Sequence, residues 1–343
     1  MKRKNRLLAA LIAVLLTGPV AAQTLDWEVQ ASGFFDNREG EDNHRMPGTH
    51  NGLHLRPLLT LSEQEQGHHH ITAGYNALIE WGADNELGAD GLIAYYEYTS
   101  EHLNILLGKY PRGKMREVMP DYLLCDSIKY YRPCQTGFDI QYVAPHGYAE
   151  FYLDWTAKRS ETVREQFMMG SNVHFMCRNL QLGVNGYYYH YATERYGAEI
   201  GHRPHDNALI HPYIGLQWQQ LGVLDSLDIR TGVLVGLDRN RATDNRFHTP
   251  VGFLGEVTAA KKRFSVQETF YAGGRHQYYG QEGFGEYYWG DTFYRSPWYS
   301  RTDVYFDIIK DRYVSLKMGA VFHLTEHGLQ FGQLLTLSAR IGN

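Results

Sequence analysis

The sequence predicts an all-β fold: a transmembrane, up-and-down antiparallel β-barrel of about 16 strands, with about 14 as the alternative count. Three observations predict it. Polar and apolar residues alternate with a period of two in many segments. Short and long connections between these segments alternate along the chain. Aromatic residues make up 14% of the chain, and many fall near the segment ends, which the rims of a membrane barrel favour.

The first 22 residues have the pattern of a signal peptide. Basic residues open the chain, an apolar run follows over residues 7–16, and small residues at 20–22 provide a cleavage site. The run is too short to cross a membrane as a helix. The alternative is a buried N-terminal helix. We expect residues 1–22 to be removed and residues 23–343 to form one barrel domain.

The alternation of side chains is clearest near the C-terminus. In residues 329–341, one face is largely apolar and the other carries mainly Gln, Gly, Thr, Ser and Arg. Such a strand has one side for lipid and one for water, and a tilted membrane strand needs roughly 9–11 residues. The predicted strands are 25–35, 51–61, 69–80, 91–99, 103–110, 136–144, 148–156, 167–177, 180–191, 208–218, 227–238, 250–260, 264–272, 302–309, 313–324 and 328–342.

The connections alternate between tight and long until a brief last loop near residues 325–327. Outer-membrane barrels are built in this way, with short periplasmic turns and long extracellular loops. Three residues fit the pattern poorly. Pro57 and Pro212 fall inside predicted strands, where they cannot donate to the hydrogen-bond ladder. Glu268 is expected on the lipid side unless a bulge changes the register.

From residue 23 to residue 343, the chain resembles the porin-like outer-membrane barrels of Gram-negative bacteria. The resemblance lies in topology and pattern, not in a diagnostic motif, and the chain departs from it by ending without an aromatic residue. It implies a location in the bacterial outer membrane and a channel for small hydrophilic solutes. The implied partners are outer-membrane lipid and the solute, with a homo-oligomer or a surface protein as further candidates.

The residues expected to face the lumen carry more acids than bases. This excess favours cations, or neutral molecules such as sugars, over anions. The alternative is that the charges only solvate the inner wall and pair with each other. The main lumen-lining candidates are Arg56, Glu97, Asp154, Asp228, Arg230, Asp303, Asp307 and Lys317.

The third long loop, residues 111–135, is the candidate constriction, because it resembles by position the loop that many porins fold into the lumen. The alternatives are a cap on the barrel or a contact with neighbours. Its cysteines Cys125 and Cys134 could form a disulfide in an oxidising compartment, which would leave Cys177 unpaired. The charged residues that could face each other across the constriction are Arg112, Lys114, Arg116, Glu117 and Asp121.

The seventh long loop, residues 273–301, is rich in aromatic residues among glycines and acids. Such rings suit sugars, apolar solutes or a protein partner. An equally weighted alternative is a self-packed plug, which would make the protein a surface adhesin or an assembly partner instead of a channel. The recognition candidates are Tyr287, Tyr288, Trp289 and Trp298.

Catalytic motifs are absent from the sequence. It contains neither a His-x-Ser pattern of the outer-membrane phospholipase type nor a Gly-x-Ser-x-Gly elbow. A membrane-embedded hydrolase is therefore the third interpretation, and we expect no enzymatic activity, no cofactor and no metal site. The net charge of −5 provides no basic surface for nucleic acid.

Overall fold

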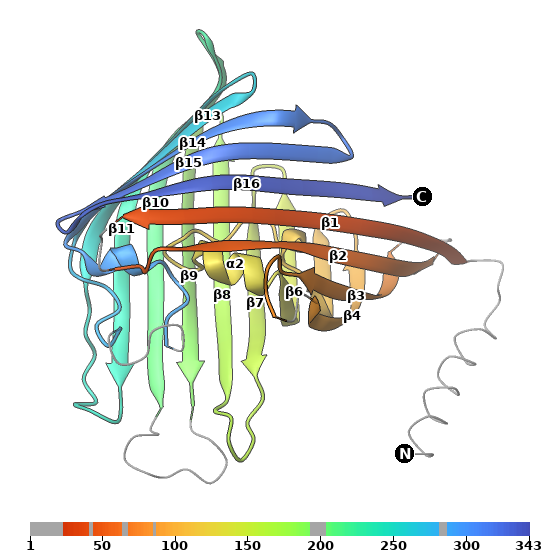
Figure 1. Cartoon of the computed structure of the whole chain (residues 1–343), viewed down its shortest axis with the longest axis horizontal. Helices are drawn as coiled ribbons and strands as arrows, with labels where there is room; N and C mark the ends of the chain where they lie inside the picture. The colour runs from red at the N-terminus through yellow and green to blue at the C-terminus, as the bar shows by residue number, and fades with distance from the viewer. Residues whose placement is uncertain (1–22, 41–43, 64–67, 85–86, 193–203, 281–286) are drawn as a thin grey trace.

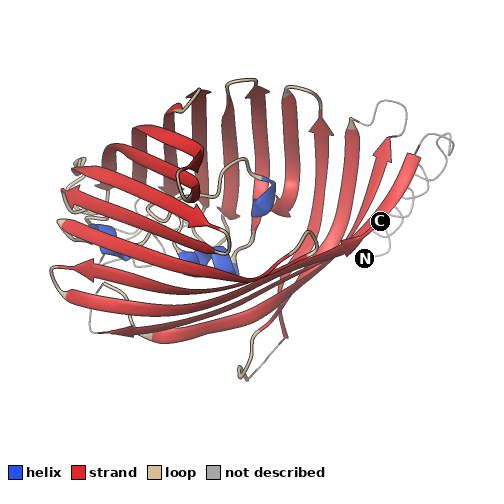
Figure 2. Ribbon diagram, turned by 90° about the horizontal axis from the view of Figure 1, so that it is seen from above, coloured by secondary structure: helices blue, strands red, loops and turns tan. Residues whose placement is uncertain are grey.

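A single sheet of antiparallel strands curves round and closes into a barrel (Figure 2). In this computed structural model, each strand pairs with its neighbours in sequence, and β1 pairs with β16 to close the sheet. The predicted fold class and the count of 16 strands are confirmed. The predicted signal peptide lies outside the described residues. The residues that the structure describes are 23–40, 44–63, 68–84, 87–192, 204–280 and 287–343.

Most of the strands are labelled in Figure 1, and the described connections include one short α-helix and two 3-10 turns. No helix among the described residues is long and apolar enough to cross a membrane. The helical segments are η2 (Arg112–Lys114), α2 (Asp126–Tyr131) and η3 (Thr292–Arg295). The strands are β1 (Gln23–Gly40), β2 (Gly48–Glu63), β3 (His69–Ile79), β4 (Leu87–Thr99), β5 (Leu103–Pro111), β6 (Cys134–Ala144), β7 (Gly147–Ala157), β8 (Gln166–Cys177), β9 (Leu180–Tyr191), β10 (His205–Leu221), β11 (Leu224–Asn240), β12 (Val251–Lys261), β13 (Phe264–Gly273), β14 (Trp298–Lys310), β15 (Val314–Thr325) and β16 (Gly328–Gly342).

Strand β10 shows how the alternation in the sequence becomes two different surfaces. Ile210, Ile214 and Leu216 are exposed, whereas His211 and Tyr213, which alternate with them, are buried. Successive side chains of a strand point to opposite faces of the sheet. The exposed apolar residues therefore form the outer wall, and the buried polar and aromatic residues face the lumen.

Strands β1 and β2 are longer than the sequence predicted. A long first loop was expected over residues 36–50, but β1 continues to Gly40 and β2 begins at Gly48. That expectation is wrong, because the backbone ladder continues past the apolar part of the wall and pairs Asp36 with His50. Polar side chains can remain in a strand there, since the ladder satisfies their backbone groups. Residues that were expected in a loop thus lie in strands, where their side chains hold fixed positions that face the lumen.

The two strand prolines each interrupt pairing with one neighbouring strand. The β2–β3 register omits residues 56 and 57, and Pro57 pairs only with β1. The β10–β11 register omits residues 211 and 212, and Pro212 pairs only with β9. Because proline lacks an N–H, a local gap on one side keeps it within the strand without shifting the rest of the ladder.

The interior of the barrel is filled by two loops. We call the β5–β6 loop, residues 112–133, L3, and the described residues of the β13–β14 loop, 274–280 and 287–297, L7. Figure 2 shows the helical segments inside the ring of strands, and α2 packs against β1, where the rings of Phe34 and Tyr130 stack with centroids 4.6 Å apart. The main core of the molecule therefore lies in the lumen, between the loops and the inner wall.

Glu268 lies on the outer, lipid-facing side of β13. Its neighbours on that face, Val266 and Phe270, are exposed. Two hydroxyls on β14 donate to its carboxylate, Ser300 at 2.7 Å and Thr302 at 2.5 Å. An ionisable group facing lipid is costly unless it is paired. The two hydroxyls thus compensate in part for the carboxylate at this position.

Replacing both hydroxyls, in S300A/T302V, should destabilise the barrel by about 1–3 kcal/mol, because the carboxylate is left without donors. The temperature at which the folded band shifts in detergent gels measures this change. The triple variant S300A/T302V/E268L is the matched control and should recover the loss, since both sides of the interaction are then apolar. Equal transition temperatures for the wild type and the double variant would contradict the assignment.

Candidate functional site

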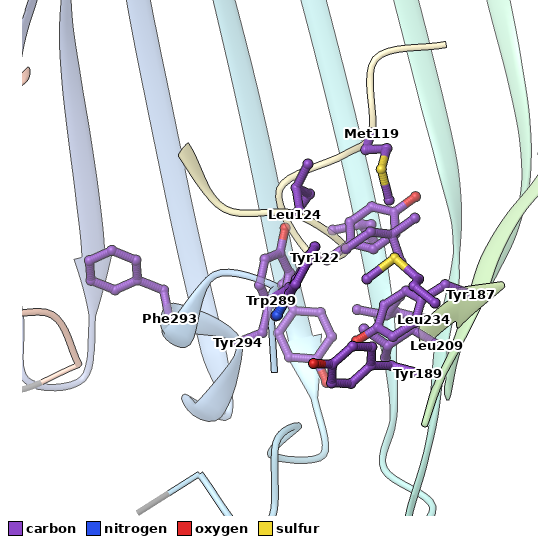
Figure 3. Packing of buried hydrophobic residues seen from close by; sticks show 14 of the residues in the cluster. Met119, Tyr122, Leu124, Tyr187, Tyr189, Leu209, Leu234, Trp289, Phe293 and Tyr294 are labelled. Carbon is purple, nitrogen blue, oxygen red and sulfur yellow. The ribbon is translucent and has the colours of Figure 1, made fainter. Parts of the chain in front are cut away.

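Loops L3 and L7 pack against each other and against the inner wall through one apolar and aromatic cluster (Figure 3). The Cys125 backbone N–H of L3 donates to the Trp289 carbonyl of L7 at 2.7 Å, and the Asp291 N–H donates to the Asp121 carbonyl at 2.8 Å. The two loops thus form one plug. The buried side chains of the plug are Met119, Tyr122, Leu123, Leu124, Trp289, Phe293 and Tyr294, and those of the wall are Tyr152, Met168, Tyr187, Tyr189, Tyr191, Leu209, Leu234, Leu254, Tyr271 and Tyr299.

Arg301 of β14 anchors L3 to the wall. Its guanidinium forms ion pairs with Asp121 and Asp126 of L3 and with Asp303 on its own strand, at 2.8 Å for the last pair. Burial alone would raise the pKa of the Asp126 carboxyl, but Arg301 and Lys129 hold it below its usual value. Charge neutralisation inside the lumen is therefore part of what fixes the loop.

The predicted constriction residues do meet charges of opposite sign on the wall. Arg112 pairs with Asp154 of β7, and Lys114 lies 2.7 Å from Glu97 of β4. The other contacts are Glu117 with Arg230 at 3.1 Å, Asp121 with Arg301, and the backbone N–H of Arg116 with Glu150 at 2.8 Å. L3 is held by these pairs, and a role in selecting solutes stays a prediction.

The remaining lumen candidates also lie in paired arrangements. Asp228 and Arg230 are 3.2 Å apart, and Asp307 is 3.9 Å from Lys317. Arg56 donates to Ser32 on β1. The two acid–base pairs bring opposite charges of the inner wall together, and a role of these residues in selecting solutes stays a prediction.

The aromatic residues that were candidates for recognition do not form an exposed surface. Tyr288 is buried and donates to Asp238. Trp289 is buried beneath the Arg132 guanidinium, 5.0 Å from the ring centroid, and Tyr287 lies against His205 with centroids 4.3 Å apart. Trp298 begins β14 instead of lying in the loop. The arrangement is the self-packed plug, which was the alternative expectation.

The disulfide that was considered between Cys125 and Cys134 does not form. None of Cys125, Cys134 and Cys177 takes part in a disulfide in the structure. Cys125 directly precedes α2, whereas Cys134 is the first residue of β6. Burial raises the pKa of the Cys125 thiol to about 11, with Asp291 acting in the same direction, so it is a poor nucleophile.

A second cluster of polar side chains lies between β1, β2 and α2, at the long-loop end of the barrel. Arg38 is buried and holds Asp36 through two hydrogen bonds of 2.8 and 2.6 Å. Its Nη1 atom donates to Nε2 of His50 at 3.1 Å and to Oγ of Ser127 at 2.8 Å. The hydroxyl and the imidazole are thus within two hydrogen-bond lengths of each other. We call Asp36, Arg38, His50, Glu80, Ser127 and Tyr131 the rim cluster.

The tautomer of His50 follows from its partners. Because arginine can only donate, Nε2 of His50 accepts, and Nδ1 carries the proton. Nδ1 lies 3.3 Å from the Tyr131 hydroxyl, which is in turn hydrogen-bonded to Glu80. Burial raises the pKa of the Tyr131 hydroxyl, and Glu80 raises it further, so the hydroxyl stays protonated as a donor to the carboxylate. A carboxylate, a hydroxyl and an imidazole thus follow one another, an order that orients a base, and the Arg38 guanidinium lies between the imidazole and Ser127.

Two other serine and histidine pairs occur among the described residues. Ser62 Oγ lies 2.9 Å from Nδ1 of His70 at the short-turn end. Ser296 Oγ lies 3.2 Å from Nε2 of His44, but Ser296 is fully buried and its other neighbour, Glu326, bonds to the serine itself. The rim cluster is distinguished by Nη1 of Arg38, which donates to both its serine and its histidine.

Sequence reasoning missed the rim cluster because its members come from four separate segments. Arg38 and Ser127 are 89 positions apart in the chain. The signal that could have found part of it is the pair Asp36 and Arg38, two residues apart and therefore on one face of a strand. Arg301 and Asp303 show the same spacing.

Among the described residues, three of the larger cavities are lined by residues of the plug. The outer chamber, of 380 Å³, lies on the long-loop side and is lined by Asp154 and Trp289. On the short-turn side, the basic chamber of 570 Å³ is lined by Lys114 and Arg340. The acidic chamber of 460 Å³ lies against β9 to β14. Arg112 lines both the outer and the basic chamber.

Solved outer-membrane proteins share this fold at low sequence identity. A loop L8 deletion mutant of OmpT from Vibrio cholerae has a TM-score of 0.52 and 9% identity, over 93% of this chain and 100% of that one. OprD from Pseudomonas aeruginosa has a TM-score of 0.51 and 10% identity, over 93% and 94%. OmpF of Salmonella typhi, solved with daunomycin, has a TM-score of 0.52 and 8% identity, over 93% and 98%. The predicted porin-like resemblance is confirmed for the fold.

No curated protein matches the chain by sequence. A family model described as Lipid A 3'-O-deacylase-type matches residues 17–341. The expectation of no enzymatic activity is therefore wrong, since the family takes its name from a deacylase. The expectation failed because it relied on local motifs, whereas groups for catalysis can be assembled from distant strands. The chain belongs to the Lipid A 3'-O-deacylase-type family.

Proposed function

We propose that this protein is an outer-membrane ester hydrolase that removes an acyl chain from a lipid A-type glycolipid, with the rim cluster as its active site. The observation that carries the proposal is that Ser127 Oγ and His50 Nε2 share one donor, Nη1 of Arg38. The family description supports the reaction and the substrate class. The cluster lies at the long-loop end, which faces the outer leaflet in barrels of this kind.

The chemistry follows the roles of a serine hydrolase. Substrate binding displaces the Arg38 N–H from His50, and Ser127 Oγ attacks the ester carbonyl while its proton passes to Nε2 of His50. The carbonyl oxygen becomes an oxyanion that the Arg38 N–H stabilises. The intermediate expels the sugar oxygen, which takes the proton from His50. Water then attacks the acyl-serine by the same route, releasing the fatty acid and restoring Ser127.

Two exposed apolar residues flank the rim cluster and suit the acyl chain. Met46 precedes β2 and Trp81 follows β3, and both are largely exposed. The Trp81 backbone N–H donates to Asn51 at 3.0 Å, next to His50 in the chain. Apolar side chains at the edge of a polar cluster can bind the acyl chain of a lipid substrate, which places its ester next to the catalytic groups.

Substituting the nucleophile, in S127A, should lower the rate of fatty acid release from lipid A by about 10³-fold or more. The assay is mass spectrometry of lipid A incubated with the purified protein in detergent. S296A and S62A are matched controls that remove the serine of the other two pairs, and both should keep wild-type rates. If S296A or S62A loses activity while S127A keeps it, the rim cluster is not the active site.

Removing the hydroxyl that orients His50, in Y131F, should lower kcat by on the order of 10–100-fold and leave KM nearly unchanged, because the base is misoriented but present. Steady-state kinetics on the same substrate separate the two parameters. H50Q should lose more than Y131F, since it removes the base itself. A Y131F effect confined to KM would argue against an orienting role.

A narrow solute channel is the second candidate function, and it is favoured by the position of Arg112. This residue lies between the outer and basic chambers and pairs with Asp154. We propose that the two chambers and Arg112 form a path for small hydrophilic solutes, with cations or neutral molecules such as sugars preferred. The bacterial outer membrane is the location that goes with both functions.

Truncating the side chain in R112A should join the two chambers and increase the single-channel current in planar bilayers several-fold. R178A, which removes an arginine from a short turn outside the lumen, is the matched control and should conduct like the wild type. Absence of stable current steps in both the wild type and R112A would exclude the path.

A further inference from the structure

The acidic chamber has the properties of a binding site that the hydrolase chemistry does not use. It has a volume of 460 Å³ and lies between L3 and the wall of β9 to β14, on the short-turn side. Its polar lining includes Gln267, Thr269 and Thr258. The rim cluster lies at the opposite end of the barrel, so a ligand here occupies a separate site.

The charges that line the chamber do not balance. Its six carboxylates face three cationic groups, Lys129, Arg230 and Arg301. The carboxylates are Glu117, Asp121, Asp126, Asp228, Glu256 and Asp303. Five of the six form ion pairs with these three cations. The chamber thus keeps an excess of negative charge.

Glu256 is the carboxylate that lacks an ion pair among the described residues. Arg230 lies directly opposite it in the β11–β12 register. The Arg230 guanidinium nevertheless binds Glu117 and Asp228 instead, at 3.1 and 3.2 Å. Glu256 is therefore a partly buried carboxylate in the wall of a cavity, next to a cation that is already engaged.

Asn185 provides a second and independent acceptor. It is 2% exposed, lines the same chamber, and its Oδ1 atom has no hydrogen-bond partner among the described residues. Its side chain bonds to the Tyr122 hydroxyl, which in turn lies 2.8 Å from Nδ1 of His211. A buried acceptor without a donor costs free energy. A ligand that brings a donor would remove this cost.

We propose that the acidic chamber binds a small organic cation with at least two amine groups, held by Glu256 and Asn185. Both residues offer acceptors, so the ligand must supply N–H donors. The cavity is much larger than a metal ion, and Tyr294 and Tyr305 line it, where ring faces attract ammonium groups. A flexible diamine fits the volume, the charge and the two acceptors.

Cadaverine is the probe, and pentanediol, its uncharged counterpart, is the ligand control. Isothermal titration of the full mature chain in detergent should show saturable cadaverine binding at one site per chain and no binding of pentanediol. E256Q should weaken cadaverine binding at least tenfold, and N185A should weaken it too. S127A should bind cadaverine as the wild type does, which separates this site from the proposed hydrolase.

The matched control is D26N, which removes a lumen carboxylate of β1 outside the chamber. It should bind cadaverine within twofold of the wild type. The proposal is overturned if cadaverine does not bind, or if D26N and E256Q weaken binding equally, since binding then reflects only the general charge of the lumen. Heat-modifiable migration of each variant verifies that it folds, and N185A tests the site if E256Q does not fold.

Discussion

Backbone hydrogen bonds that must be satisfied without water are the constraint on which the structure depends. In hydrocarbon, a sheet can pair every N–H and C=O only if it has no edges. Pairing of β1 with β16 removes the last two edges and fixes the barrel at 16 strands. That width leaves an interior too large for wall side chains to fill. The loops and chambers inside the barrel follow from this closure.

The plug fills the lumen by two kinds of contact. Aromatic and aliphatic side chains of L3 and L7 pack into one cluster with the wall, and this burial supplies hydrophobic stabilisation. Arg301 neutralises two carboxylates of L3, those of Asp121 and Asp126. Buried charges are tolerated only where they are paired. The pairing therefore fixes the position of L3, and that position defines the rim cluster and all three chambers.

The two ends of the barrel carry different chemistry. At the long-loop end, Arg38 holds a serine and an oriented histidine, which supports the family's reaction. At the short-turn end, Glu256 and Asn185 offer acceptors to the acidic chamber. The plug separates the two sites, so the proposed hydrolase and the proposed cation site lie on opposite sides of it. Arg112 lines both the outer and the basic chamber.

The sequence by itself determined the barrel, because a period of two is a local property that any strand between lipid and water must show. It located nearly all of the strands and identified residues 111–135 as a candidate for a loop inside the lumen. Only the tertiary structure decided that L7 is a plug and that Arg38, His50 and Ser127 meet. Arg301 and Asp121 are 180 positions apart. Contacts of that kind depend on how a loop folds back into a closed lumen, which no local pattern encodes.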